Sequence, residues 1–205
     1  RNQKKQTLRH LTMVAILLIL TSCGRDSNLS DGQSSGTIDR VASEFNLLVP
    51  VDAVIEKLSD GFAFTEGPVW DRRTNQLYFS DLSSNAIHTW SDAEGLKTFL
   101  KPVFDGETEH AMVGSNGLTI DSEGRLLLME HGNRVVSRIE ADGSRTILAD
   151  DYNGNRLNSP NDSVWHSNGW LYFTDPPYGL AGLEQDPLRE LGFNGIYRLD
   201  PESLC

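Results

Sequence analysis

Three oxygen-bearing side chains stand at the starts of three similar stretches of sequence, and together they could bind a cation. Glu66 opens Glu-Gly-Pro-Val-Trp-Asp, Asn116 opens Asn-Gly-Leu-Thr-Ile-Asp, and Asn161 opens Asn-Asp-Ser-Val-Trp. Carboxylate and amide oxygens are the ligands that a hard cation such as Ca²⁺ prefers. A site with only one carboxylate leaves much of the cation's charge uncompensated, and this charge can polarise a carbonyl group or activate water. The alternative is that Asn and Glu before Gly or Pro simply form turns.

The elements that would position these residues are short apolar segments that repeat. The starts of the three stretches are separated by 50 residues (116 − 66) and 45 residues (161 − 116). The segments are rich in Val, Ile, Leu, Tyr and Trp, which predicts strands at 66–71, 77–81, 86–90, 116–121, 125–130, 134–139, 161–165, 170–175 and 195–200. Gly-containing breaks predict tight turns at 92–95 and 141–144. No long stretch has helical periodicity, so few helices are expected.

Sheets of four strands that repeat at this interval are typical of a β-propeller. A β-sandwich would also have short strands, but it would not explain three similar repeat starts. We therefore predict an all-β fold with about three propeller blades in residues 51–205. Inner strands line a propeller's central channel, so the three starts should meet at one mouth of it. Three blades cannot close a ring, so we expect residues 24–205 alone to aggregate.

The charge and the residue composition limit the classes of partner that the protein can bind. The formal net charge is −11, and it becomes −15 (−11 − 4) without residues 1–22, which hold four basic and no acidic side chains. Such an acidic body repels nucleic acid and makes divalent cations plausible partners, although acidity also serves solubility alone. The two cysteines, Cys23 and Cys205, lie near the ends, so the sequence predicts no internal disulfide framework. The four tryptophans, Trp70, Trp90, Trp165 and Trp170, are expected to pack between blades.

The N-terminal residues predict export. A basic stretch and the apolar run 11–20 form a segment too short to span a bilayer, which is typical of a signal peptide at 1–22. Leu20-Thr21-Ser22-Cys23 resembles a bacterial lipobox, which implies lipidation of Cys23; the alternative is an ordinary signal peptide. Residues 23–50 would then be a tether. We expect a protein held at the cell envelope by this lipid alone, and a sequence truncated at both ends.

Five motifs carry a family resemblance: Thr-Glu-Gly-Pro-Val-Trp at 65–70, Asn-Gly-Leu-Thr-Ile-Asp at 116–121, Glu-His-Gly at 130–132, Ser-Pro-Asn-Asp at 159–162 and Phe-Thr-Asp-Pro-Pro-Tyr-Gly-Leu at 173–180. Over roughly residues 55–200 the chain resembles the gluconolactonase/regucalcin family of six-bladed β-propellers. The resemblance implies one catalytic divalent cation, usually Ca²⁺ and sometimes Zn²⁺, and hydrolysis of a sugar lactone or related ester. A small-molecule lactone is therefore the implied substrate.

The resemblance also assigns roles. Glu66 matches the family's glutamate metal ligand, Asn161 matches an asparagine that binds the metal or the substrate, and Asn116 lies in a motif common among bacterial members. The catalytic aspartate of the family would lie beyond residue 205, so this fragment alone is expected to be inactive. Further candidates for contact with substrate or metal share a place near strand ends: His131, Asp162, Asp175 and Tyr178.

Several alternatives stay open. His131 could instead be a hydrogen-bonded residue buried between blades, and Asp175 could belong to a turn at a strand end. The whole protein could be a noncatalytic, surface-anchored binding module, or an arylesterase or phosphotriesterase of the same fold. The sequence predicts no oligomeric state.

Overall fold

The computed structural model describes residues 35–108, 110 and 112–200. The predicted signal peptide at 1–22 and the lipidation candidate Cys23 lie outside these residues. The chain divides into two compact units, Arg1–Leu58 and Ser59–Cys205. In the first, a short 3-10 helix, η1 (Ser43–Leu47), is followed by a loop whose Val49 carbonyl accepts a hydrogen bond of 2.8 Å from Arg40 Nη1. Within the described residues no helix has the length and apolar character needed to cross a bilayer.

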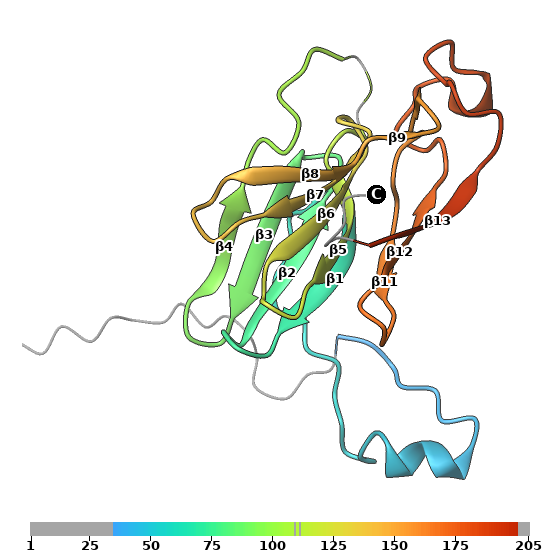
Figure 1. The fold of residues 1–205 in the computed structure, drawn as a ribbon. Helices are drawn as coiled ribbons and strands as arrows, with labels where there is room; N and C mark the ends of the chain where they lie inside the picture. The colour runs from blue at the N-terminus through green and yellow to red at the C-terminus, as the bar shows by residue number, and fades with distance from the viewer. Residues whose placement is uncertain (1–34, 109, 111, 201–205) are drawn as a thin grey trace, which may run out of the picture. The chain divides into compact units, whose positions relative to one another are not determined.

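The second unit is built from antiparallel sheets whose strands follow chain order (Figure 1). We name three of these sheets as blades. Blade 1 holds β1 (Thr65–Asp71), β2 (Gln76–Asp81), β3 (Ala86–Ser91) and β4 (Gly95–Leu100). Blade 2 holds β5 (Ser115–Ile120), β6 (Leu126–Glu130), β7 (Val135–Ile139) and β8 (Arg145–Ala149). Blade 3 holds β11 (Ser163–Trp165), β12 (Leu171–Asp175) and β13 (Gly195–Leu199).

Two shorter elements lie before and within blade 3. The hairpin of β9 (Asp151–Tyr152) and β10 (Asn155–Arg156) precedes blade 3, and the 3-10 helix η2 (Leu183–Gln185) lies in the loop between β12 and β13. All nine predicted strands are present, with ends that differ from the predicted ones by at most two residues. The all-β prediction is confirmed, and the blades form part of a β-propeller. Six blades in a complete ring stays a prediction.

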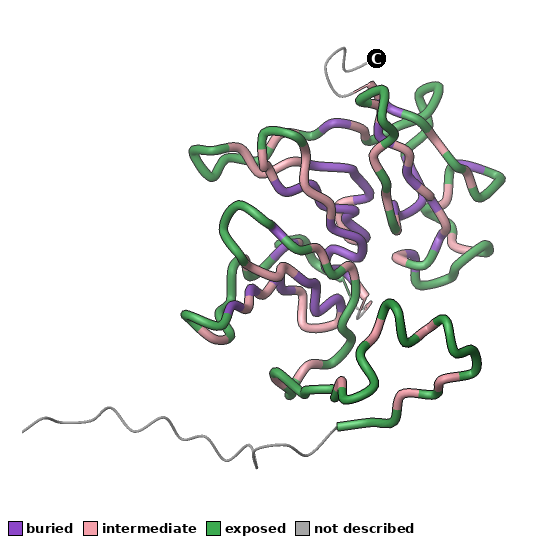
Figure 2. The backbone as a smooth tube through the Cα atoms, turned by 90° about the horizontal axis from the view of Figure 1, so that it is seen from below, coloured by how far each residue is buried: buried purple, intermediate pink, exposed green. Residues whose placement is uncertain are grey.

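The blades stack face to face, and β6 in the middle blade is buried on both sides. Because successive side chains of a strand point to opposite faces, Leu126 and Leu128 pack in the cluster shared with Ile87 of blade 1. Leu127 and Met129 pack in the other cluster, which includes residues of blade 3 such as Phe173. Figure 2 shows buried backbone where the sheets face one another and exposed backbone at the turns. An uninterrupted apolar run is therefore required at this strand.

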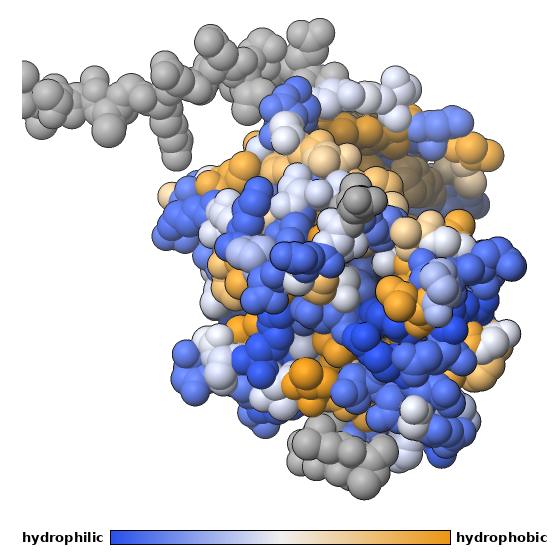
Figure 3. Space-filling model, turned by 90° about the horizontal axis from the view of Figure 1, so that it is seen from above, coloured by the Kyte–Doolittle hydropathy of each residue, from blue (hydrophilic) through white to orange (hydrophobic). Residues whose placement is uncertain are grey.

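The outer faces carry apolar side chains without cover. Ile196 of β13 is 77% exposed and Val164 of β11 is 64% exposed. Trp165 packs against the core cluster between blades 2 and 3, as predicted. Trp70 is 45% exposed; the adjacent Val69 packs toward blade 2, so Trp70 lies on the other face of blade 1, and its packing between blades stays a prediction. Figure 3 shows apolar side chains interrupting the hydrophilic surface of one face of the molecule.

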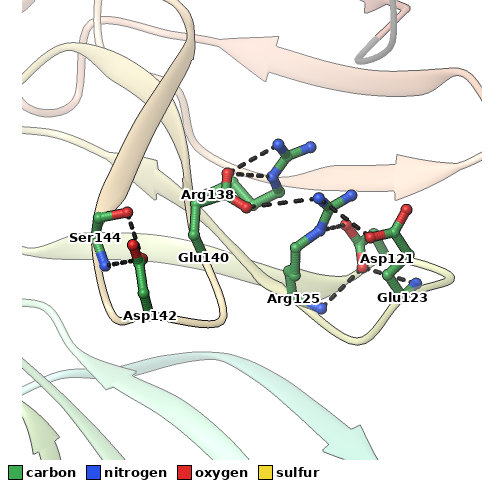
Figure 4. Close-up of polar contacts among 7 residues, drawn as sticks. All are labelled: Asp121, Glu123, Arg125, Arg138, Glu140, Asp142 and Ser144. Atoms are coloured by element: carbon green, nitrogen blue, oxygen red, sulfur yellow. Dashed lines mark hydrogen bonds and ion pairs between the residues drawn. The ribbon is translucent and has the colours of Figure 1, made fainter.

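The predicted turn at 141–144 joins β7 to β8 (Figure 4). Glu140 N donates to Ser144 O over 2.8 Å, and Gly143 has φ of 82°, a left-handed conformation that glycine adopts without strain. Asp142 Oδ1 accepts hydrogen bonds from the backbone N of Ser144 at 2.9 Å and from its Oγ at 2.6 Å. This turn forms from local sequence, as expected of an Asp-Gly pair.

An ion-pair network lies at the end of blade 2 where β5 finishes (Figure 4). Arg125 Nε contacts Asp121 Oδ2 at 2.7 Å, and Arg125 Nη1 reaches Glu140 Oε2 at 3.5 Å, while Arg138 pairs with Glu140 at 2.8 Å. Asp121 also accepts the backbone N–H groups of Glu123 and Arg125. Burial opposes ionisation of Asp121, but these hydrogen bonds lower its pKa. The network holds the β5–β6 turn, at the opposite end of β5 from Asn116.

Candidate functional site

The starts of the three inner strands lie side by side, although the sequence separates them by 45 residues or more. Gly117 N donates to Asn161 O over 2.7 Å, which joins blade 2 to blade 3. A Cβ atom on Gly117 would lie 2.7 Å from Asn161 O, and one on Gly67 would lie 2.2 Å from Asn116 O. Both distances are below any real Cβ contact, so the backbones can approach this closely only with glycine after the first residue of the first two stretches.

This approach brings the Asn116 and Asn161 side chains into direct contact. Asn116 Nδ2 donates to Asn161 Oδ1 over 2.8 Å, and it also faces His131 Nε2 at 3.4 Å. Asn116 is buried, with 7% of its surface exposed. Because Nδ2 points to two acceptors, the Oδ1 atom of Asn116 is the part of this amide left without a partner among the described residues. The structure thus brings together three polar side chains, Asn116, His131 and Asn161, which span 45 residues of the sequence (161 − 116).

His131 is fully buried at the end of β6. Its backbone N donates to Gly114 O over 3.1 Å, and a Cβ on Gly179 would come within 2.6 Å of the His131 Cβ, so two loops pack closely on this residue. Burial lowers the pKa of His131 to about 4, against the opposing effects of the Met112 backbone and the Asn161 side chain. The ring is therefore neutral near pH 7, and its Nε2 can accept a hydrogen bond from Asn116.

Glu66 stands in the same row, but its carboxylate does not touch the amides in this structure. The side chain is exposed, and its Oε2 accepts a hydrogen bond of 3.2 Å from its own neighbour, Gly67 N. Its carboxylate has no ion pair within the part of the chain that the structure describes, so its charge is available to a cation. Glu66, Asn116 and Asn161 supply one carboxylate and two amides. This all-oxygen set fits a hard divalent cation in chemical type.

The set does not by itself fill the coordination of Ca²⁺, which takes six to eight oxygen ligands. Across the described ranges no three His, Cys, Asp or Glu side chains are grouped closely enough to hold a metal ion. The donors present are therefore mostly neutral, and further ligands must come from water, substrate or other residues. A cation at these residues stays a prediction.

Asp175 has a structural function in this fold. Its Oδ2 accepts the backbone N–H of Asn158 at 2.7 Å and its Oδ1 accepts that of Ser159 at 2.8 Å. Burial raises the pKa of Asp175 to about 6, although these two amides and nearby arginines favour the ionised form. Asp81 ends β2 in the same way and binds the N–H groups of Phe64 and Ala63 at 2.9 and 3.1 Å. Both carboxylates hold the loop that leads into an inner strand, which favours the turn interpretation of Asp175.

In blade 2 the carboxylate at the end of the second strand does not hold the loop that leads into the inner strand. The residue concerned, Glu130 at the end of β6, is fully buried and binds the side chains of Ser137 and Asn133. Arg145 Nη1 lies 3.2 Å from its Oε2. Burial raises the pKa of Glu130, while Ser137, Asn133 and Arg145 oppose this rise. Glu130 thus joins β6, β7 and β8 within its own blade.

The remaining candidates lie near the row without joining its hydrogen bonds. Asp162 is exposed, and its Oδ1 accepts the backbone N–H of Ser163 at 2.8 Å. The same Oδ1 would lie 2.7 Å from a Cβ on Gly117, so this carboxylate lies against the start of β5. Tyr178 is 51% exposed, and its contact is through its backbone O, which accepts a hydrogen bond of 3.2 Å from His110 Nε2. Asp162 is therefore the one of the two that lies against an inner-strand start.

A cavity of about 370 Å³ opens beside His131. Its walls include residues of two loops that the sequence did not single out, among them His110 and Arg134. Arg134 is buried, and it donates to Leu157 O at 2.7 Å and to Leu188 O at 2.9 Å. These two hydrogen bonds tie the loops that contain Leu157 and Leu188 to blade 2. Arg134 directly precedes β7 as Asn85 directly precedes β3, and both have a left-handed φ. An alignment of the repeats could therefore have shown that the two positions are equivalent. No repeat or motif marks His110.

The fold and the site together define a partial β-propeller with a row of oxygen-bearing residues at its inner strand starts. Residues 64–205 match the family described as SMP-30/Gluconolactonase/LRE-like region. The chain belongs to this family. The prediction of a gluconolactonase/regucalcin resemblance is confirmed.

Named relatives agree with this membership. Over 195 residues the chain is 32% identical to a gluconolactonase of Zymomonas mobilis subsp. mobilis, covering 93% of this chain and 55% of that protein. A solved gluconolactonase from Xanthomonas campestris is 34% identical with a TM-score of 0.59, covering 71% of this chain and 46% of the other. A further solved structure, provisionally named a gluconolactonase, is 33% identical with a TM-score of 0.68, covering 79% and 54%. The chain spans about half the length of these relatives.

Proposed function

We propose that this chain is part of a metal-dependent hydrolase that opens a sugar lactone. The observation that carries the proposal is the convergence of the three strand starts, where Asn116 and Asn161 touch and Glu66 stands in the same row. The relatives named above are gluconolactonases, which supports an aldonolactone as the substrate class. Arylesterase or phosphotriesterase activity and a noncatalytic binding module are the competing functions.

The donor chemistry supports Ca²⁺ over Zn²⁺ as the cation. Glu66 supplies a charged oxygen, Asn161 an amide oxygen, and Asn116 an amide oxygen with no internal partner. The nitrogen that zinc would prefer, His131 Nε2, faces the amide of Asn116 and is buried. When bound, a divalent cation supplies polarisation of the lactone carbonyl and stabilisation of the oxyanion.

The chain's own residues then have separate functions. Glu66 provides the formal negative charge that holds the cation in the row, while the two amides fix its position with little loss of its charge. Asp162, exposed beside Asn161, is placed to accept hydrogen bonds from substrate hydroxyl groups. The general base that activates water is a carboxylate beyond residue 205 in this proposal, so residues 35–205 alone are expected to be inactive.

The test follows acid release from glucono-δ-lactone by the longest available chain that contains this sequence. We expect hydrolysis above the spontaneous rate, its loss on thorough chelation, and its return on adding Ca²⁺. Glu66→Gln should weaken Ca²⁺ binding in calorimetry and lower the rate, and Asn116→Ala should have a smaller effect. Glu123→Gln is the matched control, because Glu123 is exposed at the opposite end of blade 2.

Two results would decide against the proposal. Activity that survives chelation would exclude the metal mechanism, and equal Ca²⁺ binding by the Glu66→Gln variant and the unaltered chain would remove Glu66 from the site. Absence of activity on a broad panel of lactones, with intact folding, would favour the binding module. Activity restricted to aryl esters or phosphotriesters would favour those alternatives.

We also propose export and lipid attachment at Cys23, on the lipobox resemblance of residues 20–23. Expression of the chain in a bacterial host with labelled fatty acid should label the protein and place it in the membrane fraction. Cys23→Ala should remove both the label and the membrane association. Equal labelling of the variant would exclude this anchor.

A further inference from the structure

His131 contacts the Asn116 amide of the site but is closed off from solvent. Its Nε2 lies 3.4 Å from Asn116 Nδ2, and its side chain is fully buried between the loop at Gly114 and the loop at Gly179. A group with no exposed surface cannot reach a substrate in the channel without a rearrangement of both loops. The role of His131 must therefore pass through the residues it touches.

The hydrogen-bonding pattern of Asn116 shows what that role can be. An amide has one donor end and one acceptor end, and Asn116 Nδ2, which can only donate, faces Asn161 Oδ1 at 2.8 Å and His131 Nε2 at 3.4 Å. Nε2 accepts this hydrogen bond in the His131 tautomer that carries its proton on Nδ1. A rotation by 180° would place Asn116 Oδ1 against another oxygen and against a ring nitrogen. Two acceptors on one side therefore set the orientation and leave Oδ1 for other partners.

We propose that His131 is a positioning residue that accepts a hydrogen bond from Asn116 and so presents Asn116 Oδ1 as a ligand for the cation or a substrate hydroxyl. The inference rests on the proposed function for the identity of that ligand, whereas the orientation of the amide rests on the two contacts of Asn116 Nδ2 and on the His131 tautomer with a bare Nε2. It replaces direct contact of His131 with substrate or metal, which was among the sequence predictions. Residues that orient metal ligands in this way commonly change metal affinity by 10- to 100-fold when they are substituted.

Two substitutions separate positioning from packing. His131→Gln retains an oxygen that can accept from Asn116, whereas His131→Leu fills the space without an acceptor. We expect His131→Leu to weaken Ca²⁺ binding by roughly 10- to 100-fold in calorimetry, and His131→Gln to bind like the unaltered chain. His166→Leu is the control, because His166 is exposed at the β11–β12 turn, away from the amides. Equal losses in the Leu and Gln variants would overturn the proposal.

A double-mutant cycle tests whether His131 acts through Asn116. If it does, His131→Leu should cause no further loss of Ca²⁺ affinity once Asn116→Ala is present, since the amide it orients is gone. If the fold-losses of Ca²⁺ affinity in the two single variants multiply in the double variant, His131 acts independently of Asn116 and the proposal is overturned. The urea midpoints of all variants report any general loss of folding separately.

A measurement without a cation keeps this inference distinct from the proposed function. In ¹⁵N-labelled protein, the Asn116 side-chain amide signals are assigned by their disappearance in Asn116→Ala. We expect His131→Leu to shift these signals and to speed their exchange with solvent by about three- to tenfold, as for one lost hydrogen bond. Unchanged signals and exchange would refute the orientation. If the unaltered chain binds no Ca²⁺, the proposed function fails while this readout still decides the inference.

Discussion

Replacing Gly67 by alanine tests whether the row of strand starts depends on close backbone approach. Gly67 has φ of +56°, and an added Cβ would meet Asn116 O at 2.2 Å, Leu118 N at 2.8 Å and the Gly117 Cα at 2.9 Å. All three atoms belong to the backbone of β5, so no side chain can rotate out of the way. Blades 1 and 2 would have to move apart for the methyl group to fit.

The matched control is Gly95→Ala at the first residue of β4. Gly95 has a similar φ of +65°, but nothing lies within 4 Å of its added Cβ. The control therefore measures only the free-energy cost of the left-handed conformation, which is about 1 kcal/mol for alanine. Gly67→Ala has the same conformational cost and, in addition, the cost of the overlap between the new methyl group and the β5 backbone. An overpacked site typically costs about 2 kcal/mol. The total expected loss in free energy of unfolding is about 3 kcal/mol.

Urea unfolding followed by tryptophan fluorescence provides the measurement. With a slope of about 2 kcal/mol per molar urea, the excess of about 2 kcal/mol should lower the midpoint of Gly67→Ala about 1 M below that of Gly95→Ala. Equal midpoints for the two variants would refute the close packing of β1 on β5. A larger loss in Gly95→Ala would refute the reasoning altogether.

Three further predictions concern charge and exposed surface. Because burial raises the pKa of Asp175 to about 6 from the ordinary 3.8, the folded state binds its proton more tightly, so the free energy of unfolding should fall by about 3 kcal/mol as pH rises from 3.5 to 7. Asp175→Asn should remove this fall in urea titrations, and an unchanged pH profile would contradict the assignment. Asp121→Ala should cost about 2 kcal/mol against less than about 0.5 kcal/mol for Glu123→Ala, because the Asp121 side chain is 6% exposed and binds two backbone N–H groups whereas that of Glu123 is 64% exposed. Similar thermal midpoints would show that the network is not structural. Replacing both Val164 and Ile196 by lysine should reduce self-association of residues 35–205 in sedimentation, and unchanged association would show that this face is not responsible.

The pattern of apolar residues determined the blades. Segments such as 126–129 are apolar throughout because their strand is buried on both faces, and Asp-Gly at 142–143 specifies its own turn through local hydrogen bonds. These features act over a few residues, so they can be seen in a linear sequence. The phase of the repeat also showed which residues stand at equivalent strand starts, including Asn116 and Asn161.

The tertiary structure alone decided which candidates meet and how their atoms point. The sequence could not show that Asp175 spends both carboxylate oxygens on backbone amides, because Asn158 and Ser159 reach it only through the path of the loop. It also could not show that His131 is buried against Asn116 while the Glu66 carboxylate accepts the backbone N–H of Gly67. Side-chain direction depends on burial and on contacts between blades, and these arise only once segments distant in sequence pack together.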